Sequence, residues 1–375
     1  MIWVKRCIRA LVASTWIILF AFGCPAVAED HESGWNDQTI GDFAAKTLAR
    51  QRGFEILPLF KIPVDVEAAI KSVTAEQLFS VTENQVVKFP DQILKTERLV
   101  FQERGILEMT AIDQPYIVIV AKLVEFDAPQ SHSEIRRPPD AKSPDGATGS
   151  VGANGLSYDP DNEDGRGRRG RNGQPGGRGE DGGTETLPDV YLLFGGIETQ
   201  GNVPEPGTID LDVAFPGLSG GNGGYGGQGG NGGDGERGRR AVQYLGGCKR
   251  GPGWGGHGGS AGRGGQGGNS GAGGDGAVFF ISGPVDVVEL MTYFGYRNDG
   301  GAPGKGGGPG NTGGSGGRGG NAGKPDLPNC RLVDFRKGSR GQPPSLAHLG
   351  RGDDSTITGD KGKAFLGLVD VDAIF

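Results

Sequence analysis

Glycine occupies every third position from Gly217 to Gly238, and this period constrains the fold more than any other feature of the chain. A second glycine register runs beside it from Gly221 to Gly233, and the third register carries Asn222, Tyr225, Gln228, Asn231 and Asp234. A period of three fits neither an α-helix nor a β-strand, but it fits an extended left-handed helix with three residues per turn. Two faces of such a segment are bare backbone, so neighbouring segments can approach closely and share backbone hydrogen bonds.

The same glycine period returns in several runs, which apolar strand-like stretches separate along the chain. These runs cover Gly146–Gly155, Gly167–Gly182, Gly253–Gly274 and Gly301–Gly319, and strand-like stretches include Val190–Ile197, Ile209–Phe215 and Val278–Ile281. The pattern is an internal repeat of a strand followed by a glycine run. Two glycine registers predict that segments 217–240 and 253–276 lie inside, whereas the arginine-bearing segment 167–184 should lie at an edge.

Glycine supplies 75 of the 375 residues, and aromatic residues make up only 7 %. This composition argues against a large conventional core. A high content of glycine and proline normally signals disorder only when it lacks a period. The period is present here, so the glycine-rich part is expected to be ordered.

The first 28 residues have the pattern of a secretory signal peptide. Lys5, Arg6 and Arg9 precede an apolar stretch, which ends at the small-residue cleavage pattern Ala26-Val27-Ala28. We therefore expect an exported chain, secreted or located in the periplasm or cell envelope, with no membrane span. A lipid anchor at Cys24 is the alternative interpretation.

Two cysteines, Cys248 and Cys330, remain after removal of the signal peptide. In an oxidising compartment they are expected to form one disulfide. Two separate free thiols are the alternative.

Residues 29–130 form a first domain after the signal peptide 1–28, with helices predicted at Thr39–Arg52 and Ala75–Val81. Short β-rich runs follow from Val86 to Phe126, and their spacing suits either a small sheet or a few turns of a β-solenoid. The glycine-triplet region covers residues 131–324, and a strand-containing tail covers residues 325–375. The predicted fold class is therefore mostly irregular/β, with short strands feeding a bundle of polyglycine-II helices and a small helical N-terminal part.

The triplet runs, including GATGSVG, GRNGQPGGRGEDGG and CKRGPGWGGHGG, resemble those of exported bacterial collagen-like, glycine-rich proteins. They also resemble the polyglycine-II bundles of some antifreeze proteins and phage tail-tip adhesins. The resemblance covers roughly residues 143–323. It implies an architecture of packed glycine-rich helices and says little about activity.

The sequence contains no constellation that points to catalysis, a metal ion or a cofactor. His31, His132, His257 and His348 lack the spacing to Cys, Asp or Glu that metal sites use. Catalytic, metal and cofactor residues are therefore predicted to be none. The signal peptide and the net charge of −7 also argue against a nucleic-acid partner.

Six side chains are candidates for surface binding. The arginines of GRGRRGR could hold an acidic polysaccharide or another cell-surface anion, although a solvated edge explains them too, and two aromatic residues could stack on sugar rings. These candidates are Arg166, Arg168, Arg169, Arg171, Tyr225 and Trp254.

Together these features predict an exported, non-enzymatic structural or adhesive protein that presents a rigid polar surface to envelope or extracellular polysaccharide. A collagen-like trimeric stalk is the first alternative. An enzyme with its site in residues 29–130 is the second. The sequence leaves the oligomeric state open.

Overall fold

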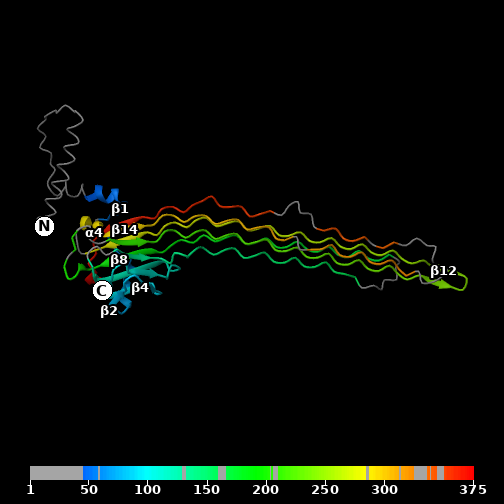
Figure 1. Ribbon diagram of the computed structural model, residues 1–375, viewed down its shortest axis with the longest axis horizontal. Helices are drawn as coiled ribbons and strands as arrows, with labels where there is room; N and C mark the ends of the chain where they lie inside the picture. Colours follow the sequence, from blue (N-terminus) through cyan, green and yellow to red (C-terminus); the bar gives the residue numbers. More distant parts are fainter. Residues whose placement is uncertain are drawn as a thin grey trace, which may run out of the picture.

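The computed structural model describes residues 45–57, 60–128, 132–158, 166–202, 204–205, 210–283, 287–311, 314–324, 336–337, 339–343 and 350–375. Its strands form two parallel sheets, and long glycine-rich segments extend from these sheets to a far end (Figure 1). The described residues also include a helical stretch at 45–51 and the helices α3 (Val64–Ser72), α4 (Val287–Tyr293) and α5 (Val371–Ile374).

The larger sheet has eight strands in the order β1-β15-β13-β8-β6-β4-β2, with β9 also paired to β6. Every pairing in it is parallel. Its strands are β1 (Phe54–Ile56), β2 (Glu76–Val81), β4 (Ile93–Phe101), β6 (Tyr116–Phe126), β8 (Asp189–Phe194), β9 (Ile197–Thr199), β13 (Phe279–Ser282) and β15 (Ala364–Gly367).

The smaller sheet has five strands in the order β14-β10-β7-β5-β3, again all parallel. Its strands are β3 (Val86–Phe89), β5 (Ile106–Met109), β7 (His132–Arg136), β10 (Asp210–Ala214) and β14 (Phe294–Arg297). A separate antiparallel hairpin of β11 (Val242–Tyr244) and β12 (Gly247–Arg250) lies at the far end of the molecule (Figure 1).

From β2 to β8 the chain alternates strictly between the two sheets. Parallel neighbours need a crossover connection, and here the crossover runs through a strand of the opposite sheet, so β2 pairs with β4 and β3 with β5. The early links are short, as at 82–85 and 102–105. Three later links, from β7 to β8, from β10 to β13 and from β14 to β15, contain the glycine-rich segments.

Alternating side chains of β6 show why the larger sheet is stable. Ile117, Ile119 and Ala121 belong to the core between the sheets, whereas Val118 and Val120 pack in a second cluster with residues of α3 and α5. Both faces of this strand are therefore buried, as is usual for parallel sheets.

The glycine-rich segments form two layers, which we call the glycine strip. The outbound layer, which leaves the smaller sheet, contains 143–156, 217–240 and the described parts of 300–324. The return layer, which leads to the larger sheet, contains 167–184, 253–276 and the described parts of 336–362. Successive backbone hydrogen bonds cross the strip. For example, the amide of Gly307 donates to the carbonyl oxygen of Gly268, and the amide of Gly268 donates to the carbonyl oxygen of Gly224, both at 2.8 Å.

Segments 217–240 and 253–276 each bond to four neighbours, whereas 167–184 bonds to three and 143–156 to two. The expectation that the first two segments lie inside is therefore confirmed. The expectation that 167–184 lies at an edge is confirmed as well, since within the described return layer its backbone hydrogen bonds go to 253–276 alone.

The close contacts explain why these positions are glycine. A Cβ atom at Gly307 would collide with the carbonyl oxygen of Gly224, and one at Gly224 would collide with that of Ala147. Both obstacles are backbone atoms, which cannot rotate away.

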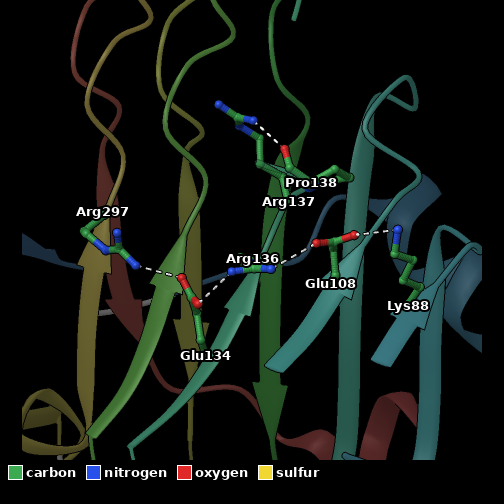
Figure 2. Close-up of polar contacts among 7 residues, drawn as sticks. All are labelled: Lys88, Glu108, Glu134, Arg136, Arg137, Pro138 and Arg297. Carbon is green, nitrogen blue, oxygen red and sulfur yellow. Dashed lines mark hydrogen bonds and ion pairs between the residues drawn. The ribbon is translucent and has the colours of Figure 1, made fainter. Parts of the chain in front are cut away.

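A buried arginine fastens the strip to the sheets. Arg137, just after β7, donates to the carbonyl oxygens of Pro216 at 2.6 Å and Gly217 at 3.2 Å. It also donates to the carbonyl oxygen of Pro138 at 2.6 Å (Figure 2). Burial lowers the pKa of this guanidinium. The first two outbound segments are thereby joined where they leave the smaller sheet.

The predicted fold class is wrong. The fold is α/β-like and is built on an eight-stranded and a five-stranded parallel sheet with few helices, not on a bundle of polyglycine-II helices. Strands such as β6 have apolar residues on both faces, and their pairing buries the core that the composition argued against. The glycine-rich segments are connections between strands of these sheets.

Two further expectations need correction. The collagen-like resemblance is overturned, because the described glycine amides of the strip bond to other segments of the same chain. The helix predicted at Ala75–Val81 is strand β2, and the helix in this region is α3.

Candidate functional site

The topology of the glycine strip gathers distant parts of the sequence at its far end. Outbound segments end there and return segments begin there, because the two layers run in opposite directions. Figure 1 shows these ends beside the β11–β12 hairpin, at the maximum distance from the sheets.

Positive charge is concentrated at this far end. The described residues within 166–172, 234–258, 315–324 and 336–343 contain fourteen basic and two acidic side chains. We call this set the distal basic surface. The basic members are Arg166, Arg168, Arg169, Arg171, Arg237, Arg239, Arg240, Lys249, Arg250, Arg318, Lys324, Arg336, Lys337 and Arg340, and the acidic members are Asp234 and Glu236.

The half of the strip near the sheets has a different charge pattern. Its cations are often paired with carboxylates three residues away, as in Lys142–Asp145 at 2.7 Å and Arg178–Asp181 at 2.9 Å. The hydrogen bond from Lys142 is the largest of several contacts that lower the pKa of Asp145. The two acids of the far end instead accept backbone hydrogen bonds, Asp234 from Arg318 N and Glu236 from Arg168 N.

A groove with a cavity volume of about 740 Å³ opens on the distal basic surface. Arg237, Arg318, Lys337 and Arg340 line it, together with Asp234 and Tyr158. The groove therefore offers several cationic groups and one aromatic ring to a ligand lying along the strip. Guanidinium groups bind carboxylate, sulfate and phosphate groups with paired hydrogen bonds.

Two aromatic rings are surrounded by arginines at this end. The guanidinium carbons of Arg166 and Arg336 lie 5.1 and 5.7 Å from the ring centre of Trp254. That of Arg168 lies 5.7 Å from the Tyr158 ring, and Arg171 Nε donates to the Tyr158 hydroxyl at 3.1 Å. These contacts hold the guanidinium groups beside apolar ring faces.

The structure brings together five of the six surface candidates predicted from sequence. Arg166, Arg168, Arg169, Arg171 and Trp254 all belong to the distal end. Tyr225 does not: its ring is 64 % exposed, but it lies in the middle of an outbound segment against Gly308.

None of the six candidates lines the groove itself. Sequence reasoning missed the side chains that do, namely Tyr158, Arg237, Arg318, Lys337 and Arg340. A signal for them exists in the sequence, because basic residues cluster where each glycine run ends or restarts, as in GERGRR and RKGSR. Only the alternation of outbound and return segments makes these clusters meet.

The polar third register has a structural role that the sequence did not reveal. Asn231 accepts a hydrogen bond from the amide of Ser315 at 2.8 Å, and Asn269 accepts one from Asp353 at 3.0 Å. Asn222 does the same for Lys305 at 2.9 Å. These side chains link neighbouring segments of one layer, so they are not free to serve as a display surface.

A ladder of ion pairs crosses the smaller sheet on the face opposite Leu107. Glu108 lies between Lys88 at 3.5 Å and Arg136 at 3.3 Å, and Glu134 accepts from Arg136 at 3.4 Å and Arg297 at 2.7 Å (Figure 2). Glu108 of β5 has cationic partners on both adjacent strands, whereas Glu134 pairs with Arg136 of its own strand and with Arg297 of β14, two strands away. Both carboxylates are therefore held by cations, and the ladder links strands of the smaller sheet.

Cys248, in β12, is disulfide-bonded. Its expected partner, Cys330, lies outside the described residues. Among the residues that the structure describes, no group of three His, Cys, Asp or Glu side chains could hold a metal ion. The described helices are also too short and too polar to cross a membrane.

Comparison with known protein families, curated proteins and solved structures finds no match for this chain. The expected membership of the exported collagen-like proteins therefore has no support from the comparisons.

Proposed function

We propose that this chain is an exported, non-enzymatic adhesive or structural protein whose distal basic surface binds an anionic polysaccharide. The sheets serve as its folded base, and the glycine strip carries the binding surface away from that base. The single observation that carries the proposal is the excess of fourteen basic over two acidic described residues at the far end.

The chemistry of the groove favours a polyanion over a neutral glycan. Arg237, Arg318 and Lys337 provide cationic donors around one open channel, and Tyr158 adds a ring face for a sugar. A linear ligand with repeated carboxylate or sulfate groups would meet several of these donors at once. Many weak contacts made simultaneously give a high overall affinity.

Export is supported by two independent features. The first 28 residues have the pattern of a secretory signal peptide. Cys248 is disulfide-bonded, and disulfides persist mainly in oxidising compartments.

The test measures binding of the mature chain to immobilised heparin, polygalacturonate and neutral dextran. We expect both polyanions to bind and dextran not to bind. Added salt should weaken the interaction, because exposed charges are screened. The triple variant Arg169→Gln, Arg318→Gln, Lys337→Gln should bind the polyanions about tenfold or more weakly, since exposed charge contacts each contribute a few tenths to about 1 kcal/mol.

The matched control removes three exposed cations elsewhere, with the variant Arg263→Gln, Lys305→Gln, Lys363→Gln. Both triple variants change the net charge equally, so only the position of the lost charges differs. Equal loss of binding in the two variants would mean that net charge alone, and not the distal basic surface, determines polyanion binding. Unchanged binding in the distal variant would refute the proposed surface.

A further inference from the structure

The tip of the β11–β12 hairpin exposes apolar side chains at the extreme end of the molecule. Leu245 is fully exposed, at 101 %, and Tyr244 is 61 % exposed. Val242, on the same strand face as Tyr244, is 44 % exposed. Adjacent exposed apolar side chains rimmed by polar residues are the kind of feature from which protein or membrane interaction sites are built.

The hairpin is built so that Leu245 occupies its turn. Tyr244 and Gly247 are paired across the hairpin, which leaves Leu245 and Gly246 as the connecting residues. Gly246 has a φ of +96°, a conformation that favours glycine. Cys248, the residue after Gly247, is disulfide-bonded, and this bond restrains the second strand of the hairpin. Leu245 is thus presented by a constrained turn.

Basic residues flank the apolar tip along the chain. Arg239 and Arg240 precede β11, and Lys249 belongs to β12, with Arg240 and Lys249 exposed. Leu245 and Tyr244 lie at or next to the turn, and Arg240 and Lys249 lie farther from it along the chain. This order matches a lipid surface, whose apolar interior lies beneath charged headgroups. Each basic residue near an anionic membrane surface contributes to attraction.

The position and size of this tip favour a lipid surface over a protein or glycan partner. A stable protein interface needs about 1,200–2,000 Å² of buried surface, far more than one hairpin turn can supply. The side chain of Leu245 has no hydrogen-bonding group for a sugar. Because the hairpin lies at the far end of the molecule, it can reach a planar layer before any other described part does (Figure 1).

We propose that Leu245 and Tyr244 insert into an anionic lipid surface, with Arg240 and Lys249 contacting the headgroups. This inference goes beyond polysaccharide binding, since it concerns the hairpin tip and a different class of partner. The glycine strip then spans the space between the lipid surface and the sheets.

The test uses sedimentation of the full mature chain with lipid vesicles. Vesicles of equal parts phosphatidylcholine and phosphatidylglycerol should bind the chain, whereas vesicles of phosphatidylcholine alone should bind it about tenfold more weakly. The double variant Tyr244→Ser, Leu245→Ser should lose about tenfold or more in binding to the anionic vesicles. Both side chains are exposed, so circular dichroism should show an unchanged fold.

The matched control is Leu368→Ser, which removes another exposed leucine, 55 % exposed, near β15. It should bind the anionic vesicles as the native chain does. The inference is overturned if the native chain fails to bind, if it binds both vesicle types equally, or if the double variant binds normally. The double variant should keep its affinity for heparin, so failure of this inference is distinguishable from failure of the proposed polysaccharide surface.

Discussion

In both the sheets and the glycine strip, backbone groups form hydrogen bonds with neighbouring segments. The two regions exclude water differently, because the sheets pack through side chains and the strip packs through its backbone. Side chains separate the two sheets, and Phe194 of β8 fills the space between them by stacking on Phe294 of β14, with ring centres 6.0 Å apart. In the strip, no side chain separates neighbouring segments at positions such as Gly268, where an added Cβ would collide with the carbonyl oxygen of Glu180.

This difference predicts opposite responses to mutation. A side-chain core loses stability when atoms are removed, whereas a side-chain-free layer loses stability when atoms are added. The distal basic surface depends on the second kind of packing, because the strip holds its segments in register.

The largest effect is expected from Phe194→Ala in the core of the sheets. Truncating a fully buried phenylalanine should lower the free energy of unfolding by about 3–5 kcal/mol, because contacts are lost and a cavity remains. Urea unfolding monitored by circular dichroism measures this loss. A cost below about 1 kcal/mol would mean that the sheets do not share a tight core.

Adding one methyl group to the strip should lower the free energy of unfolding by about 2–3 kcal/mol when the group points at backbone atoms. Gly307→Ala places a Cβ against the carbonyl oxygen of Gly224, which cannot move without breaking neighbouring hydrogen bonds. Hydrogen exchange at the amides of the strip measures the effect, which should exceed the effect on the sheets.

The adjacent glycine provides the control for this substitution. A Cβ at Gly308 would meet the exposed ring of Tyr225, with the nearest atom at 2.7 Å, and this ring can turn away. Gly308→Ala should therefore cost less than half as much. Equal costs at the two positions would contradict the description of the strip as backbone packed on backbone.

A smaller effect is expected for the side chains that link neighbouring segments. Asn231→Ala removes the acceptor for the amide of Ser315 and should destabilise the strip by about 1 kcal/mol, the typical net contribution of one hydrogen bond. Gln228→Ala changes an exposed residue one triplet earlier in the same register and serves as the control. Faster exchange of the Ser315 amide in the first variant alone would support the linking role.

The smallest effect is a dependence of stability on pH at the start of β8. Burial raises the pKa of Asp189 above its ordinary value of 3.8. The protonated carboxyl therefore favours folding, and this contribution is lost as the pH rises through the pKa of the folded state. Asp189→Asn should be more stable than the native chain at neutral pH, and the two should converge at a pH below 3.8. Urea midpoints across this range test the sign, and a native chain more stable than the variant at pH 7 would contradict it.

Much of the local structure could be predicted from sequence. The period of three indicated which glycines face neighbours, and the number of glycine registers separated the inner segment 217–240 from the more peripheral 167–184. The apolar stretches at Val190–Ile197 and Ile209–Phe215 correspond to β8, β9 and β10. The spacing of glycine or apolar residues indicates which faces of a segment are buried, and this spacing can be read from that segment alone.

The partners of those strands could not be predicted. β8 and β10 are near in sequence but lie in different sheets, where they pair with β6 and β13, and with β7 and β14. Ala364–Gly367, expected in a separate tail, forms β15 between β13 and β1. Strand pairing between distant residues depends on the whole fold, and the low aromatic content hid how large the shared core is.

The same limit applies to the candidate site. The sequence identified Arg166, Arg168 and Trp254 as residues that could bind, but it did not place Arg318 or Lys337 near them. Their approach depends on the alternation of outbound and return segments, which the two sheets impose.

By itself, the sequence determined the glycine period, the excess of positive charge where each run turns and the amphipathic or fully apolar character of each strand. The tertiary structure decided that those strands form two parallel sheets and that the runs return in pairs to a common end. The physical reason is that side-chain periodicity specifies which faces must be covered, whereas only the folded chain specifies what covers them.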